Sequence, residues 1–149
     1  MAATGVLFVC MGNICRSPTA EAVFVHLAAD KGMAEEFRVD SAGTGDWHRG
    51  QSPDPRAVAA GARAGYQVGG RARVVTGADF DDFDVIVAVD DENLAALRAM
   101  APAGSRAAVR KLSDDDVPDP YYGGDADFDD VVRRIEQASA RLLDDLRQG

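Results

Sequence analysis

The sequence contains little cysteine and little histidine. Its 149 residues include two cysteines, Cys10 and Cys15, and two histidines, His26 and His48. Two cysteines are too few for a scaffold held together by disulfides, and a structural zinc site requires four ligands. Neither histidine is close to a cysteine in the sequence. We therefore expect no metal site.

Long apolar runs are absent as well, and none approaches the roughly 20 residues that a transmembrane helix requires. The opening residues 1–9 have no basic flank and no small-residue cleavage pattern, so they do not resemble a signal peptide. The expected compartment is therefore the cytoplasm.

Positive charge is in short supply, with 16 basic residues against 25 acidic ones and a net charge of −9. Binding to nucleic acid or to an anionic membrane requires clustered Lys and Arg, so neither partner is expected. The acidic runs at 79–84, 114–116 and 125–130 are interpreted as solvated loops or helix starts.

Short apolar segments alternate with helical patterns along the chain. Strands are expected at residues 4–9, 37–41, 84–89 and 106–112. Helices are expected from Ser17, as N-cap, to Gly32, at 54–65, at 92–100, and from about Phe128 to the C-terminus. This alternation predicts an α/β fold with a parallel sheet, in one domain spanning residues 1–149.

The loop after the first strand is the strongest candidate site, because open parallel sheets bind ligands at the C-terminal ends of their strands. It reads Cys10-Met11-Gly12-Asn13-Ile14-Cys15-Arg16-Ser17 and leads into a helix. Such a loop can wrap around one tetrahedral anion with its backbone N–H groups pointing inward. Gly12 and Asn13 are residue types that tolerate the left-handed backbone that this wrap requires.

The side chains of this loop suit phosphate chemistry. Arg16 can fork onto two phosphate oxygens. The electropositive surroundings that this loop creates favour the thiolate of Cys10, which would attack phosphorus and form a phosphocysteine. Ser17 could donate a hydrogen bond to that sulfur. The alternative is a buried structural cysteine beside a surface arginine, which leaves Gly12 and Asn13 unexplained.

Expulsion of a phenolate or alkoxide also calls for a general acid, and Asp119 is the best candidate. The flanking Pro118 and Pro120 restrict its backbone, and Tyr121 and Tyr122 offer flat walls for an aromatic substrate. The alternative interpretation of this Pro-rich and Gly-rich segment is an ordinary turn.

At this point the sequence resembles the low-molecular-weight protein tyrosine phosphatases. The resemblance rests on three segments: Val9–Pro18, Asp40–Thr44 followed by Trp47-His48, and Asp119–Gly123. It implies a four-stranded parallel sheet flanked by helices on both faces, a three-layer sandwich of the flavodoxin or Rossmann type. It also implies no metal and no organic cofactor, a phosphotyrosine-bearing protein as substrate, and a monomer or weak dimer.

The resemblance also assigns roles to residues of this chain. Cys10 would be the nucleophile, Arg16 the clamp, and Asp119 the acid and then the base for water. The phosphate would lie against residues 11–17. Three polar side chains would shape the loop, namely Asn13, Ser17 and Ser41. Three aromatic side chains would line the substrate cleft, namely Trp47, Tyr121 and Tyr122. Cys15 would be the neighbour able to form a reversible disulfide with Cys10. For Trp47, a partly buried anchor of a long loop is an equal alternative.

Two features depart from the family pattern or leave a role open. Many members carry a histidine just before an Ala-Arg pair, hydrogen-bonded to the loop asparagine, whereas this chain reads Gly69-Gly70-Arg71-Ala72-Arg73. What orients Asn13 is therefore open. Asp90 matches an acidic position of the family, although a helix N-cap role explains it equally well.

Three other functions fit parts of the pattern. An arsenate reductase on this fold would need further cysteines, and none follows Cys15. Phosphoarginine phosphatases carry a threonine where this chain has Ile14, whose apolar side chain favours a phenyl ring. A non-catalytic phosphotyrosine-binding module would need Arg16 but not both Cys10 and Asp119.

Overall fold

A single four-stranded parallel sheet organises the protein. The computed structural model describes residues 2–148 and gives the strand order β2-β1-β3-β4. The strands are β1 Thr4–Cys10, β2 Phe37–Gly43, β3 Val85–Ala88 and β4 Ala108–Lys111. Each neighbouring pair is parallel, which confirms the predicted α/β class.

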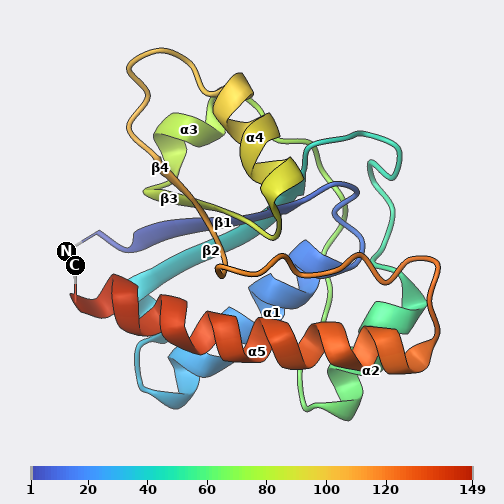
Figure 1. Ribbon diagram of the computed structural model, residues 1–149. Helices are drawn as coiled ribbons and strands as arrows, with labels where there is room; N and C mark the ends of the chain where they lie inside the picture. The colour runs from blue at the N-terminus through green and yellow to red at the C-terminus, as the bar shows by residue number, and fades with distance from the viewer. Residues whose placement is uncertain (1, 149) are drawn as a thin grey trace.

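Helices cover both faces of this sheet (Figure 1). The helices are α1 Arg16–Asp30, α2 Pro55–Arg63, α3 Asp79–Asp82, α4 Asp91–Met100 and α5 Asp125–Gln148, with a 3₁₀ turn at Ala34–Glu36. Helices α1 and α5 pack on one face, with α2 beside α5, and α3 and α4 pack on the other. The predicted three-layer arrangement is therefore confirmed.

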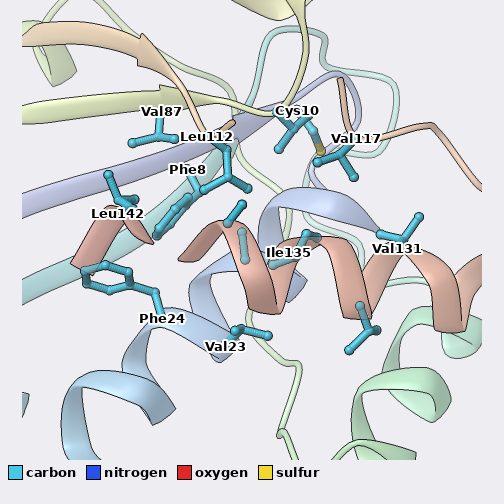
Figure 2. Close-up of a cluster of buried hydrophobic side chains, with 14 of the residues drawn as sticks. Phe8, Cys10, Val23, Phe24, Val87, Leu112, Val117, Val131, Ile135 and Leu142 are labelled. Carbon is cyan, nitrogen blue, oxygen red and sulfur yellow. The ribbon is translucent and has the colours of Figure 1, made fainter. Parts of the chain in front are cut away.

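The alternation of β1 explains why the core is divided into two clusters. Phe8 and Cys10 point to the α1 and α5 side, whereas Leu7 and Val9 point to the α3 and α4 side. Figure 2 shows Cys10 and Val117 together at one end of the larger cluster. The last residue of a fully buried strand thus places the Cys10 sulfur at the carboxyl edge of the sheet.

The predicted boundaries of the four strands differ from the observed ones by at most two residues. The predicted helix start was wrong in its cap: α1 begins at Arg16, and Cys15 occupies the N-cap without a side-chain hydrogen bond. The Ser17 hydroxyl does not cap the helix because it is turned toward Cys10 and Asn13.

The acidic run at 79–84 contains a helix start, one of its two predicted forms, but it is not solvated throughout as expected. It forms the short helix α3, and the Asp79 side chain is buried. Its carboxylate accepts hydrogen bonds at 3.0 and 3.1 Å from the Arg73 guanidinium and one from the Thr76 backbone. A buried carboxylate requires such partners, and the arginine that supplies them lies six positions before the acidic run.

Within residues 2–148, no helix is both long enough and apolar enough to cross a membrane.

One buried hydroxyl in α5 offers a stability test. Ser139 is fully buried, and its Oγ has no hydrogen-bond partner in the described part of the chain. An unsatisfied buried hydroxyl costs on the order of 1–3 kcal/mol. We expect Ser139→Ala to raise the thermal midpoint by about 3 °C, measured by differential scanning calorimetry.

The matched control is Ser52→Ala, which removes an exposed hydroxyl and should leave the midpoint unchanged. An unchanged or lower midpoint for Ser139→Ala would mean that the hydroxyl is satisfied in solution.

Candidate active site

The loops that follow β1, β2 and β4 meet at the carboxyl edge of the sheet (Figure 1). They enclose a cleft of about 530 Å³. The cleft is lined by Cys10, Met11, Gly12, Ile14, Cys15, Arg16, Trp47, His48, Asp119, Tyr121 and Tyr122. The structure therefore brings together residues from three predicted segments, the first and last of which are more than 100 positions apart in the chain.

The loop at residues 10–16, here called the cup, has its backbone carbonyls bonded from outside. Four of these carbonyl oxygens each accept one backbone N–H: that of Cys10 from Thr44 (3.0 Å), that of Met11 from Gly45 (3.0 Å), that of Ile14 from Asp54 (2.8 Å) and that of Cys15 from Thr19 (3.2 Å). In a planar peptide the C=O and the following N–H point in opposite directions. The N–H groups that follow these four carbonyls therefore point to the inner side of the cup. The Asn13 N–H also lies on the inner side, 3.3 Å from Cys10 Sγ.

Asn13 alone provides the left-handed turn of the cup. Its φ is +56°, whereas Gly12 has no positive φ, so the prediction was right for Asn13 and wrong for Gly12. Gly12 instead leaves room for His48, because an added Cβ would lie 2.9 Å from Cδ2 of that ring and would displace it. Asparagine tolerates the left-handed region better than most residues.

The side-chain amide of Asn13 is held by three partners. Its Nδ2 donates to Ser17 Oγ at 2.7 Å and to Ser41 Oγ at 3.0 Å, and its Oδ1 accepts from the backbone N–H of Arg73 at 3.0 Å. The backbone N–H of Arg73 therefore orients Asn13 in this chain, which lacks the histidine expected from the resemblance. Neither His26 nor His48 takes part in this network.

These bonds fix where the hydroxyl protons point. Because Ser17 Oγ and Ser41 Oγ each accept from Asn13, their own protons are free to be donated elsewhere. Ser17 faces Cys10 Sγ at 3.0 Å, and Ser41 donates to Glu21 Oε1 at 2.8 Å. Burial raises the pKa of Glu21, and the Ser41 hydrogen bond partly offsets this rise.

Arg16 is buried at the side of the cup. Its Nη1 donates to Asp90 Oδ2 at 2.7 Å and to the Val117 carbonyl at 2.9 Å. Both interpretations of Asp90 therefore fit: one carboxylate oxygen pairs with Arg16, and the other, Oδ1, accepts from the N–H of Asn93 and caps α4. One side of the guanidinium is therefore fixed, which leaves the rest of the fork to face the cleft.

Asp119 reaches over the cup from the segment after β4. Its Oδ2 lies 3.8 Å from Nη2 of Arg16, and its Oδ1 accepts from the N–H of Tyr121 at 3.1 Å. The side chain of Asp119 is 51% exposed, so both the cup and solvent can reach it. This is the position that proton exchange with a bound group requires.

Aromatic side chains form the rim of the cleft. Tyr121 and Tyr122 meet edge to face with centroids 5.0 Å apart. Trp47 is 68% exposed, so it is not the partly buried anchor that was the alternative. Its ring lies over Gly45, where an added Cβ would come within 1.8 Å of Cζ3.

The two cysteines of the cup are free thiols in different surroundings. Burial raises the pKa of Cys15 to about 12, and the nearby charges of Asp54, Cys10 and Asp119 add to the rise. Cys15 therefore stays a thiol at neutral pH. Cys10 instead faces the Ser17 hydroxyl and the Asn13 N–H.

Several residues of the site carried no usable sequence signal. Glu21 is one charged residue within a helix, which is ordinary, and Arg73 acts through its backbone, which no side chain announces. Asp54 and Arg56 form the start of α2, where an Asp-Pro pair indicates only an N-cap. Within residues 2–148, no group of three or more His, Cys, Asp or Glu side chains is arranged to hold a metal ion.

Comparison with known proteins gives one consistent result. A family model described as low molecular weight phosphotyrosine protein phosphatase matches residues 5–149. Low molecular weight phosphotyrosine protein phosphatase 2 of Drosophila melanogaster is 44% identical over 152 residues, covering 97% of this chain and 93% of the relative. Low molecular weight protein-tyrosine-phosphatase YfkJ of Bacillus subtilis is 44% identical over 146 residues, covering 93% and 92%.

Solved structures agree with these relatives. A crystal structure of protein tyrosine phosphatase from Entamoeba histolytica with Hepes in the active site superposes with a TM-score of 0.95. Its sequence is 38% identical to this one, and the match covers 99% of both chains.

The contrast between the two cysteines can be tested with iodoacetamide. The thiolate is the reactive form, and a pKa of about 12 leaves a thiolate fraction on the order of 10⁻⁵ for Cys15 at pH 7. We expect alkylation at pH 7 to be confined to Cys10, as measured by peptide mass mapping. Inorganic phosphate should slow it, and Cys10→Ser should remain unmodified. Equal modification of Cys15, which also lines the cleft, would contradict this.

The pKa of Glu21 gives a test by pH. Its pKa in the folded protein lies above the ordinary 4.5, so folding favours the protonated carboxyl. This contribution to the stability of the fold is lost as the pH rises through the raised pKa. Glu21→Gln keeps an oxygen acceptor for Ser41 and removes the buried charge. We expect the variant to gain stability relative to wild type at pH 7.5, with the gain vanishing near pH 4, in urea titrations.

The control is Glu35→Gln, an exposed position whose stability difference should not depend on pH in this way. A Glu21→Gln difference that is the same at both pH values would show that ionising Glu21 carries no penalty.

Proposed function

This chain belongs to the low molecular weight phosphotyrosine protein phosphatase family and is a protein tyrosine phosphatase, and we propose that Cys10 performs its reaction through a phosphocysteine intermediate. The observation that carries this proposal is the placement of Cys10 Sγ inside the cup, facing the Ser17 hydroxyl and the Asn13 N–H. A sulfur anion there faces the phosphorus of any phosphate that the inward N–H groups hold.

In the first step the phosphate of the substrate occupies the cup. The free part of the Arg16 guanidinium binds two of its oxygens, while Asp90 holds the other side. The Cys10 thiolate attacks in line, so that an S–P bond forms and the P–O bond to the phenol breaks. Asp119 donates its proton to the departing oxygen, which leaves as a neutral phenol.

In the second step the same carboxylate acts as a base. Asp119 takes a proton from a water molecule, whose oxygen attacks phosphorus and breaks the S–P bond. The electron pair returns to sulfur, where the Ser17 hydroxyl stabilises the anion at 3.0 Å. Inorganic phosphate then leaves, and Asp119 is protonated for the next cycle.

The substrate proposed is the phosphotyrosine side chain of a protein. Trp47 and Tyr121 provide aromatic surface for a phenyl ring, and Ile14 adds an apolar side chain to the cleft wall. Phosphate-binding contacts are assigned to residues 11–17, with Asn13, Ser17 and Ser41 shaping the loop. Tyr122, which is 97% exposed, would contact the polypeptide around the phosphotyrosine.

We also propose the cytoplasm as the site of action. A catalytic thiolate must stay reduced, and the cytoplasm keeps thiols such as Cys10 and Cys15 in that state. The net charge of −9 disfavours nucleic acid and anionic membranes as partners. We propose that the protein is a monomer or weak dimer. We also propose that it requires no cofactor, since each step above uses only side chains of this chain.

Hydrolysis of p-nitrophenyl phosphate tests the assigned roles. Cys10→Ser should abolish turnover because the S–P bond cannot form. Asp119→Ala should lower kcat/KM by about 10²-fold, the lower end of the usual contribution of a general acid, because nitrophenol is acidic enough to leave as an anion. The control is Asp115→Ala, an exposed carboxylate on the same segment, which should keep full activity. Full activity in Cys10→Ser would end the covalent mechanism.

Peptide substrates test the substrate class separately. A phosphotyrosine peptide should be hydrolysed with a higher kcat/KM than the matching phosphoarginine peptide. Ile14→Thr should narrow that difference, because it replaces apolar surface in the cleft by a hydroxyl. A wild-type preference for phosphoarginine would overturn the argument from Ile14.

A further inference from the structure

Arg56 stands at the start of α2, outside the cup, and its guanidinium is held in one orientation. Nε lies 3.1 Å from Asp54 Oδ1, and Nη2 lies 2.8 Å from Asp54 Oδ2. This is a two-pronged bond between residues two positions apart at the start of α2, which fixes the plane of the guanidinium as well as its position. These bonds also lower the pKa of Asp54, so that the pair is ionised at neutral pH.

The remaining surface of Arg56 contacts the segment that carries Asp119. Its Cζ lies 5.5 Å from the centroid of the Tyr121 ring and 4.6 Å from that of Phe128. Its Nη1 donates to the Gly123 carbonyl at 3.4 Å. An arginine over two aromatic rings is attracted to both of their faces. One side chain therefore contacts the chain on both sides of Gly123 and Gly124, at Tyr121 in the segment and at Phe128 in α5.

Asp54 connects this arrangement to the cup. Its backbone N–H donates to the Ile14 carbonyl at 2.8 Å, and its side chain is buried. On the other side, the Tyr121 N–H donates to the Asp119 carboxylate. A continuous path of contacts thus runs from the cup through Asp54 and Arg56 to Asp119.

We propose that Arg56 is a positioning residue that fixes the acid segment, residues 117–124, relative to the cup, so that Asp119 meets the leaving oxygen. The inference rests on the proposed role of Asp119 as general acid. The carboxyl of Asp119 is half exposed and receives only the Tyr121 N–H and the distant edge of Arg16. Its placement therefore depends on what holds the backbone of the segment.

A misplaced acid affects some substrates more than others. Expulsion of a weakly acidic phenol needs a proton in the transition state, whereas the more acidic nitrophenol leaves readily as an anion. The parameter kcat/KM covers every step up to release of the phenol. Loss of a positioning residue for the acid should therefore lower kcat/KM for phenyl phosphate more than for p-nitrophenyl phosphate.

The experiment compares these two substrates in wild type and Arg56→Met. We expect the loss in kcat/KM to be about tenfold larger for phenyl phosphate than for p-nitrophenyl phosphate. Arg56→Lys keeps the charge but not the fork, and it should show a smaller bias in the same direction. The matched control is Arg63→Met, which removes an exposed pairing from α2 to Asp129 of α5 and should leave both substrates unaffected.

A double variant separates positioning from general destabilisation. In an Asp119→Ala background no acid remains to be positioned, so Arg56→Met should add no further bias between the substrates. Equal losses on both substrates, or a bias that persists without Asp119, would overturn the inference. If Asp119→Ala itself shows no bias, the assignment of the acid fails, and that result is distinct from a failure confined to Arg56.

Discussion

The closure of the cup around Cys10 depends on one asparagine. Asn13 adopts a left-handed backbone, and its amide meets Ser17, Ser41 and the Arg73 backbone at the same time. Without those partners the strained turn would have little to hold it, since a left-handed non-glycine residue is disfavoured. The closure of the cup sets the distance from the sulfur to the inner N–H groups. It also places the start of α1 so that Arg16 faces the cleft.

The same amide also gives the hydrogen bonds of the site a direction. Both protons of Asn13 Nδ2 are donated to hydroxyl oxygens, so each hydroxyl must send its own proton outward. On one side that proton faces the Cys10 sulfur, and on the other it is accepted by Glu21. A half-buried carboxylate one helical turn into α1 thus helps to leave the Ser17 proton free, with the Cys10 sulfur at 3.0 Å and the Ala42 carbonyl at 3.5 Å as its neighbouring acceptors.

The sequence was sufficient to predict the sheet, the cup and the acid segment, because each is carried by a local pattern: an apolar strand, a Cys-to-Arg spacing, an Asp between prolines. It failed where the deciding contact lies outside the local pattern. The Arg73 N–H that orients Asn13 leaves no trace in side-chain identity. Asp79 was interpreted as solvated because its partner, Arg73, lies outside its acidic run. Gly12 was assigned a backbone role, although its actual constraint is the His48 ring.

The proposed nucleophile and the proposed acid are held by opposite means, and the proposed two-step chemistry explains why. Cys10 needs no water around it, so burial at the end of β1 can fix its position. In the proposed mechanism Asp119 donates to a leaving group and then accepts a proton from water, which requires the solvent exposure that its side chain has. Burial is therefore unavailable as a way of holding it. Contacts to the backbone and rings of its segment, such as those from Arg56, are the remaining way to make an exposed carboxyl precise.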